Sequence, residues 1–479
     1  MNKSIIRFIL CRVLQFEGTF MLLPCIVSVI YGEKQGLVFA CTAALTFALG
    51  TIGARFKPKS NVFYAREGFV TVSLSWILMA MVGGLPFVLT GEIPSYVDAV
   101  FETVSGYTTT GATILTNVEC LSMTSQFWRC FVIWIGGMGV LVFIMSILPL
   151  SGNYNMHLMR AESTGAEVGK LVPKVKNTAK ILYSIYIFLS VSMVIALMIA
   201  GLDLYNALLL MFSAMGTGGF ANRNASLGGF SHTVQVITEV FMLLCGINFN
   251  AYFLILMKKP KEVFKLEEVR AYLILLFSSI ICITISIKDF FPTLYDAFHN
   301  AAFQAISIMT TTGFVLMDYE VWPSISKAIL VVLTFIGACA GSTAGGIKIS
   351  RFLILFKDFR RELLKLTHPR SVKKVRFNGQ TVSEETVHTI QAFLIIYIAV
   401  VGISFLIVSL DGFDFTSSFT AVLTTISNVG PGLGKVGPAG NFASFSPLSK
   451  IVLIFDMLAG RLEIFPLIVL IYAGTWKRN

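Results

Sequence analysis

Four short segments of the chain combine glycine with small hydroxyl residues, and their oxygen atoms could bind a bare monovalent cation. The segments are Thr108-Thr109-Thr110-Gly111-Ala112, Gly216-Thr217-Gly218-Gly219-Phe220, Thr310-Thr311-Thr312-Gly313-Phe314 and Ser427-Asn428-Val429-Gly430-Pro431. A dehydrated cation needs a ring of oxygens, which backbone carbonyls supply when they all turn inward. Glycine adopts the required conformations cheaply. No segment holds a carboxylate, which argues against a divalent-cation filter built on acidic side chains.

An apolar stretch precedes each segment, at 96–107, 205–215, 295–309 and 415–426. As a helix, each would be about 16–22 Å long, which is half of a bilayer. One such stretch could equally be an amphipathic helix on the outer surface, but four copies favour re-entrant half-helices. Each half-helix would point the negative end of its dipole at the cation.

The four stretches align on their glycines. Six residues before the glycine stands a small hydroxyl, and thirteen before it a residue typical of helix N-caps. The hydroxyl residues are Ser105, Ser213, Ser307 and Thr424, and the expected caps are Asp98, Asn206, Asn300 and Ser417. Asp98 and Glu102 could alternatively attract cations from outside. The fourfold pattern predicts a repeated unit of span, half-helix, loop and span.

The composition is that of a polytopic membrane protein. Of 479 residues, 55% are hydrophobic and 13% charged, with a mean hydropathy of +0.78, whereas soluble domains carry about 25% charged residues. Spanning needs about 20 mostly apolar residues. Ten runs qualify: Phe8–Gly32, Gln35–Ala54, Gly68–Gly91, Cys130–Leu150, Ile181–Leu202, Val240–Met257, Ala271–Ile287, Ala328–Ile347, Thr389–Leu410 and Ile451–Thr475.

We therefore predict an all-α membrane protein of ten transmembrane helices. Four M1–P–M2 repeats would surround a pseudo-fourfold axis with their re-entrant pore loops, because irregular backbone at membrane depth must lie inside protein or beside water. Two extra helices occupy residues 1–66. The repeats occupy 67–178, 179–266, 267–383 and 384–479, the third including an intramembrane gate loop and a basic cytoplasmic segment.

The 37 basic and 26 acidic residues give a net charge of +11. In a soluble protein this would suggest nucleic acid, but in a membrane protein basic residues gather in cytoplasmic loops. The basic segments 151–180, 258–270 and 351–388 then place both termini in the cytoplasm, and the first apolar run is a retained helix rather than a signal peptide. Eight cysteines without a CxxC and five histidines without an HxxxH argue against disulfide frameworks and zinc sites.

Two further features could form a barrier below the ring. The run Gly337–Gly346 is too rich in glycine for a helix interior; close helix packing is one interpretation, and an irregular gate loop containing Gly337, Gly341, Gly345 and Gly346 is the one we favour. Arg461 is a costly charge within an apolar run. It could pair with a buried acidic residue or stand beside the ion path, where it would oppose resting cations.

Taken together, the four loops resemble the Trk/Ktr/HKT superfamily of potassium transporters. WIGGMG at Trp134–Gly139, GSTAGG at Gly341–Gly346 and GRLE at Gly460–Glu463 add to the resemblance, which covers nearly the whole chain. The two additional N-terminal spans are similar to those of TrkH-like bacterial membrane subunits. The resemblance implies a channel-like or symporter-like inner-membrane protein that takes up K+.

The resemblance also implies site residues and partners. Its cation sites fall on Thr109, Thr110, Gly111, Thr217, Gly218, Gly219, Thr311, Thr312, Gly313, Asn428, Val429 and Gly430. An arginine at the place of Arg461 and a glycine-rich loop act as the gate. The family subunit is a homodimer regulated by a cytosolic ring of nucleotide-binding subunits, which the basic loops would dock; this chain shows no nucleotide motif of its own.

Other functions remain open to different degrees. A sodium-conducting or sodium-coupled relative is the main alternative, although a serine in place of the first glycine is associated with sodium in plant relatives and Gly111 is glycine here. Asn428 and Val429 depart from threonine, which lowers the symmetry of the ring. An intramembrane enzyme would need clustered His, Asp or Cys residues, and a receptor would need a soluble sensor domain; the sequence shows neither.

Overall fold

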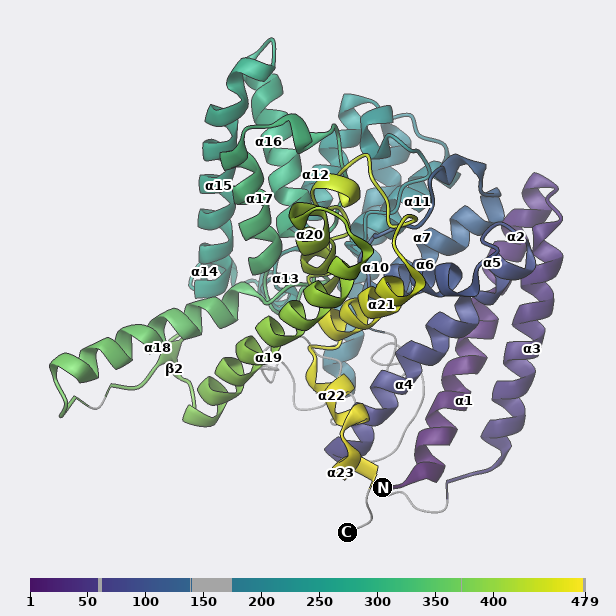
Figure 1. Cartoon of the computed structure of the whole chain (residues 1–479), viewed down its shortest axis with the longest axis horizontal. Helices are drawn as coiled ribbons and strands as arrows, with labels where there is room; N and C mark the ends of the chain where they lie inside the picture. Colours follow the sequence, from purple (N-terminus) through teal and green to yellow (C-terminus); the bar gives the residue numbers. More distant parts are fainter. Residues whose placement is uncertain (59–62, 138, 140–174, 372, 477–479) are drawn as a thin grey trace.

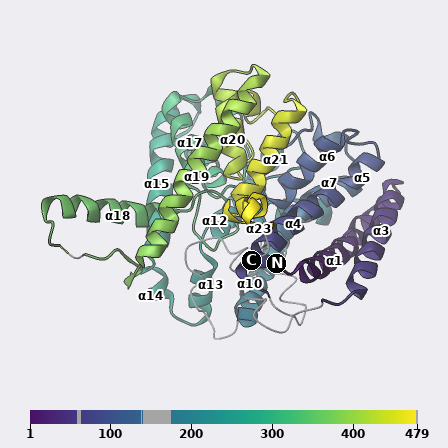
Figure 2. The ribbon, with the colours of Figure 1, turned by 60° about the horizontal axis from the view of Figure 1, so that its bottom comes forward.

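The computed structural model describes residues 1–58, 63–137, 139, 175–371 and 373–476, and is almost entirely helical. The N-terminal part contains α1 (Lys3–Phe20), α2 (Leu22–Tyr31) and α3 (Gln35–Arg55). These helices lie at one side of the molecule, opposite α15–α18 (Figures 1 and 2). The start of α1 and the last helix, α23 (Ala473–Trp476), lie at the same end (Figure 1).

Four units of helix, half-length helix and helix follow. The first unit consists of α4 (Ala65–Gly83) with α5 (Leu85–Leu89), then α6 (Tyr96–Tyr107) and α7 (Met123–Gly137). The second consists of α10 (Val175–Ile199), α11 (Leu204–Met215), and α12 (His232–Cys245) with α13 (Phe249–Leu256) and α14 (Pro260–Val263). The third unit consists of α15 (Glu267–Ile287), α16 (Leu294–Met309) and α17 (Ser324–Ile336). The fourth consists of α19 (Glu384–Val408), α20 (Phe415–Ile426), and α21 (Pro447–Arg461) with α22 (Phe465–Ile471). The half-length helices α6, α11, α16 and α20 match the predicted half-helices within one residue.

Between the third and fourth units, a helix leaves the body of the protein. It is α18 (Ile349–Thr367), followed by the short antiparallel strands β1 (Arg376–Phe377) and β2 (Gln380–Thr381). Figures 1 and 2 show α18 projecting sideways from the helices around it. Together, α18 and this hairpin form what we call the arm.

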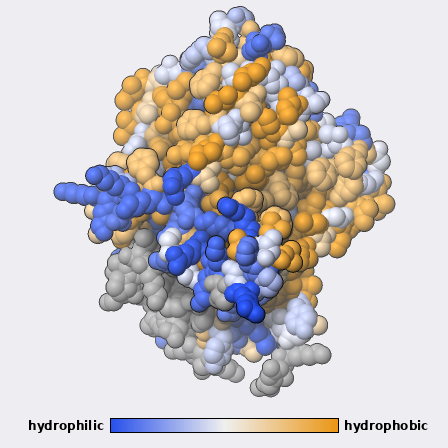
Figure 3. Space-filling view, turned by 90° about the vertical axis from the view of Figure 1, so that its left-hand side faces the viewer, coloured by the Kyte–Doolittle hydropathy of each residue, from blue (hydrophilic) through white to orange (hydrophobic). Residues whose placement is uncertain are grey.

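The outer surface is that of a membrane protein. Exposed apolar residues lie along α15 and α19, among them Ile274, Ile281, Ile395 and Leu406. Figure 3 shows hydrophobic residues over most of one face and hydrophilic ones gathered below them. In the described part of the chain, six helices are long and apolar enough to span a membrane, or seven if the bent pair α12–α13 counts as one span.

The predicted spans at the ends of the four units need correction. The run Val240–Met257 is not one helix, because α12 and α13 meet at 90° around Gly246–Asn248. Ala328–Ile347 is helical only as far as Ile336, and Ile451–Thr475 is divided between three helices. For the predicted run Cys130–Leu150, residue 138 and residues 140–150 lie outside the described residues, as do 151–174 of the first basic segment.

The half-helices also begin earlier than their alignment suggested. Ser95, Asp203 and Asp414 are the N-caps of α6, α11 and α20, each accepting a hydrogen bond from a backbone N–H three residues on, at 3.1–3.4 Å. The expected caps Asp98, Asn206 and Ser417 are the residues that donate these bonds. In α16 the cap is Thr293, one turn further upstream, which leaves Asn300 in the helix interior.

The N-terminal helices are attached to the first unit by a carboxylate. Glu33, in the turn between α2 and α3, accepts hydrogen bonds from the N–H groups of Met123 and Thr124 at 2.8 and 2.9 Å and from the Thr124 hydroxyl at 2.6 Å. These groups belong to the first turn of α7, whose N–H groups lack partners within the helix and favour negative charge. Glu33 therefore caps α7 from another part of the chain.

Glu33→Ala should lower the stability of the protein by about 1–2 kcal/mol, because it removes the acceptor of two N–H groups in the first turn of α7 and a favourable interaction with the helix dipole. The unfolding temperature of the purified protein in detergent measures the effect. Lys34→Ala, which changes the neighbouring exposed residue, is the control. Equal unfolding temperatures for the two variants would contradict this role of Glu33.

Candidate ion pathway

The four half-helices end in the same backbone motif. The N–H groups of Thr110, Gly218, Thr312 and Val429 donate to the carbonyl oxygens of Ser105, Ser213, Ser307 and Thr424, at 2.8–2.9 Å. The N–H of the residue before each donor bonds three residues back, at 3.0–3.1 Å. This pair of bonds defines a Schellman ending. The aligned hydroxyl residues thus contribute a backbone carbonyl to the motif.

A Schellman ending requires a left-handed residue, and this chain places a non-glycine residue there in every unit. Thr109, Thr217, Thr311 and Asn428 all have φ of 55° and are fully buried. The conformation costs an L-residue about 1–2 kcal/mol, and asparagine tolerates it better than threonine. The sequence predicts such conformations at the aligned glycines and does not identify these four residues. Strain of this kind persists where the surrounding structure enforces it, and it gathers at functional sites.

The four glycines pack directly against one another's loops. A Cβ atom on Gly111 would lie 2.1 Å from the carbonyl oxygen of Gly218, and one on Gly219 would lie 2.1 Å from that of Thr312. A Cβ on Gly313 would lie 2.1 Å from the carbonyl of Val429, and one on Gly430 would lie 2.6 Å from that of Thr110. Each carbonyl belongs to the residue before the next glycine, so the series closes on itself.

The closed series has a direct consequence for the backbone. All four glycines have positive φ, between 66° and 91°, and none has room for a side chain. Because left-handed residues also occur two positions earlier, positive and negative φ alternate through each segment. The structure therefore brings the four segments that contain the twelve predicted cation-site residues together as one ring.

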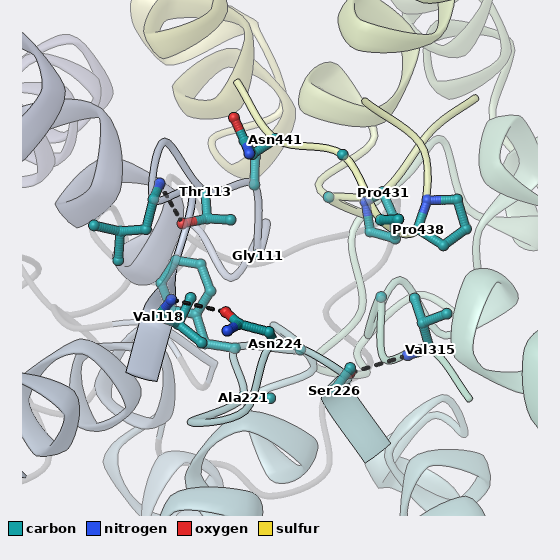
Figure 4. A pocket seen from close by; sticks show the side chains of 18 of the residues that line it. Gly111, Thr113, Val118, Ala221, Asn224, Ser226, Val315, Pro431, Pro438 and Asn441 are labelled. Carbon is teal, nitrogen blue, oxygen red and sulfur yellow. Dashed lines mark hydrogen bonds between the residues drawn. The ribbon is translucent and has the colours of Figure 1, made fainter. Parts of the chain in front are cut away.

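A cavity of about 150 Å³ lies on one side of the ring and is lined by all four glycines and the residues that follow them. Figure 4 shows Gly111 and Pro431 on different sides of the cavity, with Asn224 and Ser226 below both of them. Asn224 accepts a hydrogen bond from the N–H of Val118 at 2.9 Å, and the Ser226 hydroxyl accepts one from the N–H of Val315 at 3.2 Å. Hydrogen bonds between different units thus hold the mouth of this vestibule.

The first unit holds a buried ion pair behind its loop. Arg129 on α7 lies 2.6 Å from Glu102 on α6, and both side chains are almost fully buried. Glu102 also accepts from the Thr113 hydroxyl and from the N–H of Ile114, while Arg129 donates to the Ala221 carbonyl at 3.1 Å and lies over Phe220. The pair joins the first loop to the second.

This arrangement settles the roles suggested for the two acidic residues of α6. Glu102 is only 1% exposed and faces Arg129, so it does not attract cations from solution. Asp98 neither caps its helix nor stands alone, because its carboxylate lies 2.6 Å from the amine of Lys450 on α21.

Below the ring, the last helix of every unit ends or breaks near a glycine. The helix α7 ends at Gly137, α12 ends before Gly246, α17 ends before Gly337, and α21 ends at Arg461, next to Gly460. Sequence reasoning identified only the break at Gly337. The other breaks offered a weaker signal, because each contains one or two glycines rather than a glycine-rich run.

Residues 337–348 form an irregular segment between α17 and α18, which we call the inner loop. Gly337, Gly341, Gly346 and Lys348 have positive φ within it. The Gly345 N–H donates to the Thr311 hydroxyl at 2.6 Å, and a Cβ on Gly345 would lie 2.6 Å from the Ser427 carbonyl. The inner loop therefore lies against the side of the ring opposite the vestibule, where residues before the glycines face it. Gly341 lies further away, beside Asn248 at the break of α12.

Arg461 connects the inner loop to the end of α7. Its guanidinium donates to the carbonyl of Thr343 at 2.8 Å and to those of Gly136 and Gly137 at 2.5 and 2.7 Å. Its neighbours have other partners: Glu463 pairs with Arg351, and Asp456 accepts from the Ser404 hydroxyl at 2.7 Å. Of the predicted gate residues, the structure thus brings Gly337, Gly345 and Gly346 together and bonds Arg461 to the same loop at Thr343, while Gly341 lies apart from them beside Asn248.

Comparison with known proteins gives consistent results. A family model described as "TrkH: Cation transport protein" matches residues 35–475. The chain is 36% identical to the Trk system potassium uptake protein TrkH of Salmonella typhimurium over 99% of both chains, and 31% identical to TrkG of Escherichia coli K12 over 100% of both. The crystal structure of the potassium transporter TrkH from Vibrio parahaemolyticus superposes with a TM-score of 0.88, at 34% identity over 99% of both chains.

Gly219→Ala should abolish most cation flux through the protein, because the new Cβ cannot fit 2.1 Å from the Thr312 carbonyl and alanine disfavours a φ of 66°. Flux from proteoliposomes measures the loss. Gly402→Ala is the matched control, since a Cβ there meets nothing within 4 Å. Wild-type flux in Gly219→Ala would show that the ring is not the pathway.

Proposed function

Because this chain belongs to the TrkH family of cation transport proteins, we propose that it takes up K+ across the inner membrane of a bacterium through the ring of four loops. The observation that carries the proposal is the closed series of contacts between each ring glycine and the carbonyl of the next loop. The family and the relatives are transporters rather than enzymes.

The ring supplies what a dehydrated monovalent cation needs. The positive φ values at two positions of each segment support a backbone whose carbonyl oxygens face the centre of the ring, where they replace water around the ion. Each half-helix ends shortly before its glycine, so four negative dipole ends point at the same place. In three of the segments the side chains beside the axis are small threonines, which leave room for the ion.

The fourth segment differs in sequence from the other three, so the ring is not made of four identical segments. The Asn428 amide donates to the Thr110 hydroxyl and to the Met457 carbonyl, both at 2.9 Å, so it braces the first loop and α21. With asparagine and valine in this segment, selectivity for K+ over Na+ is lower than in a ring of four identical loops. Conduction of sodium, or coupling to it, is the alternative that ion competition distinguishes.

The inner loop and Arg461 form the gate. In the arrangement seen here, the inner loop contacts the ring through Gly345, and Arg461 fixes the loop to the end of α7. A fixed positive charge beside the path raises the energy of a cation there. Displacement of the inner loop and of Arg461 opens the path.

The remaining elements serve regulation and assembly. The protein acts as a homodimer with a pore in each subunit and both termini in the cytoplasm. A cytosolic ring of nucleotide-binding subunits docks on the basic segments, of which 258–270 and most of 351–388 are described by the structure. The chain crosses the membrane with ten transmembrane helices, and lipid surrounds the apolar faces of α15 and α19.

A bacterium that cannot take up K+ should grow at low K+ when it expresses this protein. Gly111→Ser should lower the growth rescue and the K+ preference, because a side chain at φ 78° would meet the Gly218 carbonyl. Competition between K+ and Na+ during uptake measures the preference. Rescue that fails in the wild type although the protein reaches the membrane, or uptake that favours Na+, would overturn the assignment to K+.

Arg461→Ala should raise the basal K+ conductance of the purified protein in bilayers, because it removes both a positive charge near the path and the bonds that hold the inner loop. Arg55→Ala, at the exposed end of α3 and away from the ring, is a control that also removes one arginine. Conductance that stays at the wild-type value in folded Arg461→Ala would count against the barrier.

A further inference from the structure

We propose that Glu268 is the latch that holds the inner loop closed, a positioning role that rests on the gate function proposed above. Glu268 lies in the first turn of α15, outside the ring, the vestibule and the set of predicted gate residues. Its side chain is almost fully buried, with the residue only 4% exposed.

One carboxylate oxygen of Glu268 reaches both ends of the inner loop. Oε1 accepts a hydrogen bond from the N–H of Ala340 at 2.6 Å and one from the N–H of Ser350 at 3.2 Å. Ala340 is near the beginning of the loop and Ser350 is in the first turn of α18, directly after it. The contacts join two points of the chain that most of the loop separates.

The other carboxylate oxygen contacts the break of a neighbouring inner helix. Oε2 lies 3.4 Å from the side-chain amide of Asn248, the residue at which α12 turns into α13. The same break is bonded to the loop by backbone groups, since Phe249 N–H donates to the Gly341 carbonyl at 2.9 Å and Cys339 N–H to the Gly246 carbonyl at 3.2 Å. Glu268 therefore completes a network that fixes the loop to α12.

A glutamate in the first turn of a helix commonly interacts with that helix's own dipole and faces water. Glu268 departs from this pattern because its acceptor bonds all go to other elements. Hydrogen bonds to a charged acceptor are stronger than those between neutral groups, and the low-dielectric surroundings strengthen them further. The carboxylate is thus suited to restrain a glycine-rich segment that has few side chains of its own to pack.

The neighbouring residue ties the same helix end to the arm. Glu267 pairs with Lys357 on α18, and its N–H donates to the Asn378 side chain in the β1–β2 turn at 2.8 Å. The arm projects from the body, as Figure 1 shows. Ser350 lies in the first turn of α18, the helix that carries Lys357. A displacement of α18 would therefore pull on the hydrogen bond between the Ser350 N–H and Glu268. The latch therefore offers a route by which force on the arm reaches the inner loop.

Two readouts test the latch in the full-length protein without any partner subunit. The first is basal K+ flux from proteoliposomes. The second is the rate at which a thiol reagent labels Cys339, a buried residue of the inner loop next to Ala340, measured by mass spectrometry of the peptide that contains it. Glu268→Ala should raise both rates, on the order of tenfold, because bonds that hold the loop to the protein are lost.

Two further variants provide the controls. Glu268→Gln keeps one acceptor oxygen but loses the charge, so it should give intermediate rates and tests the proposal if Glu268→Ala does not fold. Glu262→Ala removes an exposed glutamate from α14, in the same cytoplasmic segment, and should leave both rates unchanged. The unfolding temperature of each variant identifies the folded ones.

The outcomes separate this proposal from the one on which it rests. Wild-type flux and labelling in folded Glu268→Ala and Glu268→Gln, while Arg461→Ala still raises conductance, would overturn the latch and leave the gate intact. Faster labelling of Cys339 without any rise in flux would show that the inner loop is not the barrier, which overturns the gate itself.

Discussion

The architecture depends on a contact that only glycine permits. We call the place where a ring glycine meets the next segment a corner of the ring. At each corner, the glycine α-carbon lies so close to the carbonyl oxygen of the next segment that a Cβ would be 2.1–2.6 Å from that oxygen. This contact limits how the neighbouring segments can be spaced, and each segment leaves its half-helix through the same Schellman ending. The buried left-handed threonines show that the protein accepts strain to keep this geometry. Outside the ring, the helices need only hold four half-helix ends in place.

The same demand accounts for the interruption of the inner helices. Irregular backbone at membrane depth is tolerated only inside the protein or beside water, and here the helix ends satisfy one another. Arg461 donates to the carbonyls at the end of α7, Glu268 accepts from N–H groups of the inner loop, and the break of α12 exchanges bonds with the first half of that loop. The polar groups left without partners where helices break thus form the hydrogen bonds that hold the inner loop in place.

The sequence alone was sufficient to locate the ring and the half-helices, because an apolar stretch that recurs four times before an aligned glycine is typical of pore loops and of few other architectures. The bounds of α6 and α20 agree with the prediction to the residue. The predicted caps were wrong because the residue that donates to an N-cap is often polar as well, as Asp98 and Ser417 are. The 90° turn of α12 could not be predicted, since Gly246 and Asn248 lie in an otherwise continuous apolar run. Partners of charged residues, such as Arg129 for Glu102, depend on packing between segments far apart in the chain.

The ion pair between Glu102 and Arg129 has no counterpart at the aligned positions of the other three units, where Leu210, Gln304 and Ala421 replace the glutamate. In an assembly of four identical subunits, every substitution would be repeated at every corner of the ring. A ring built from one polypeptide can instead hold an ion pair behind one segment, as at Glu102 and Arg129, and an amide brace in another, as at Asn428. Each quarter of such a ring can change independently of the other three, so asymmetry of this kind is open only to a ring built from one chain.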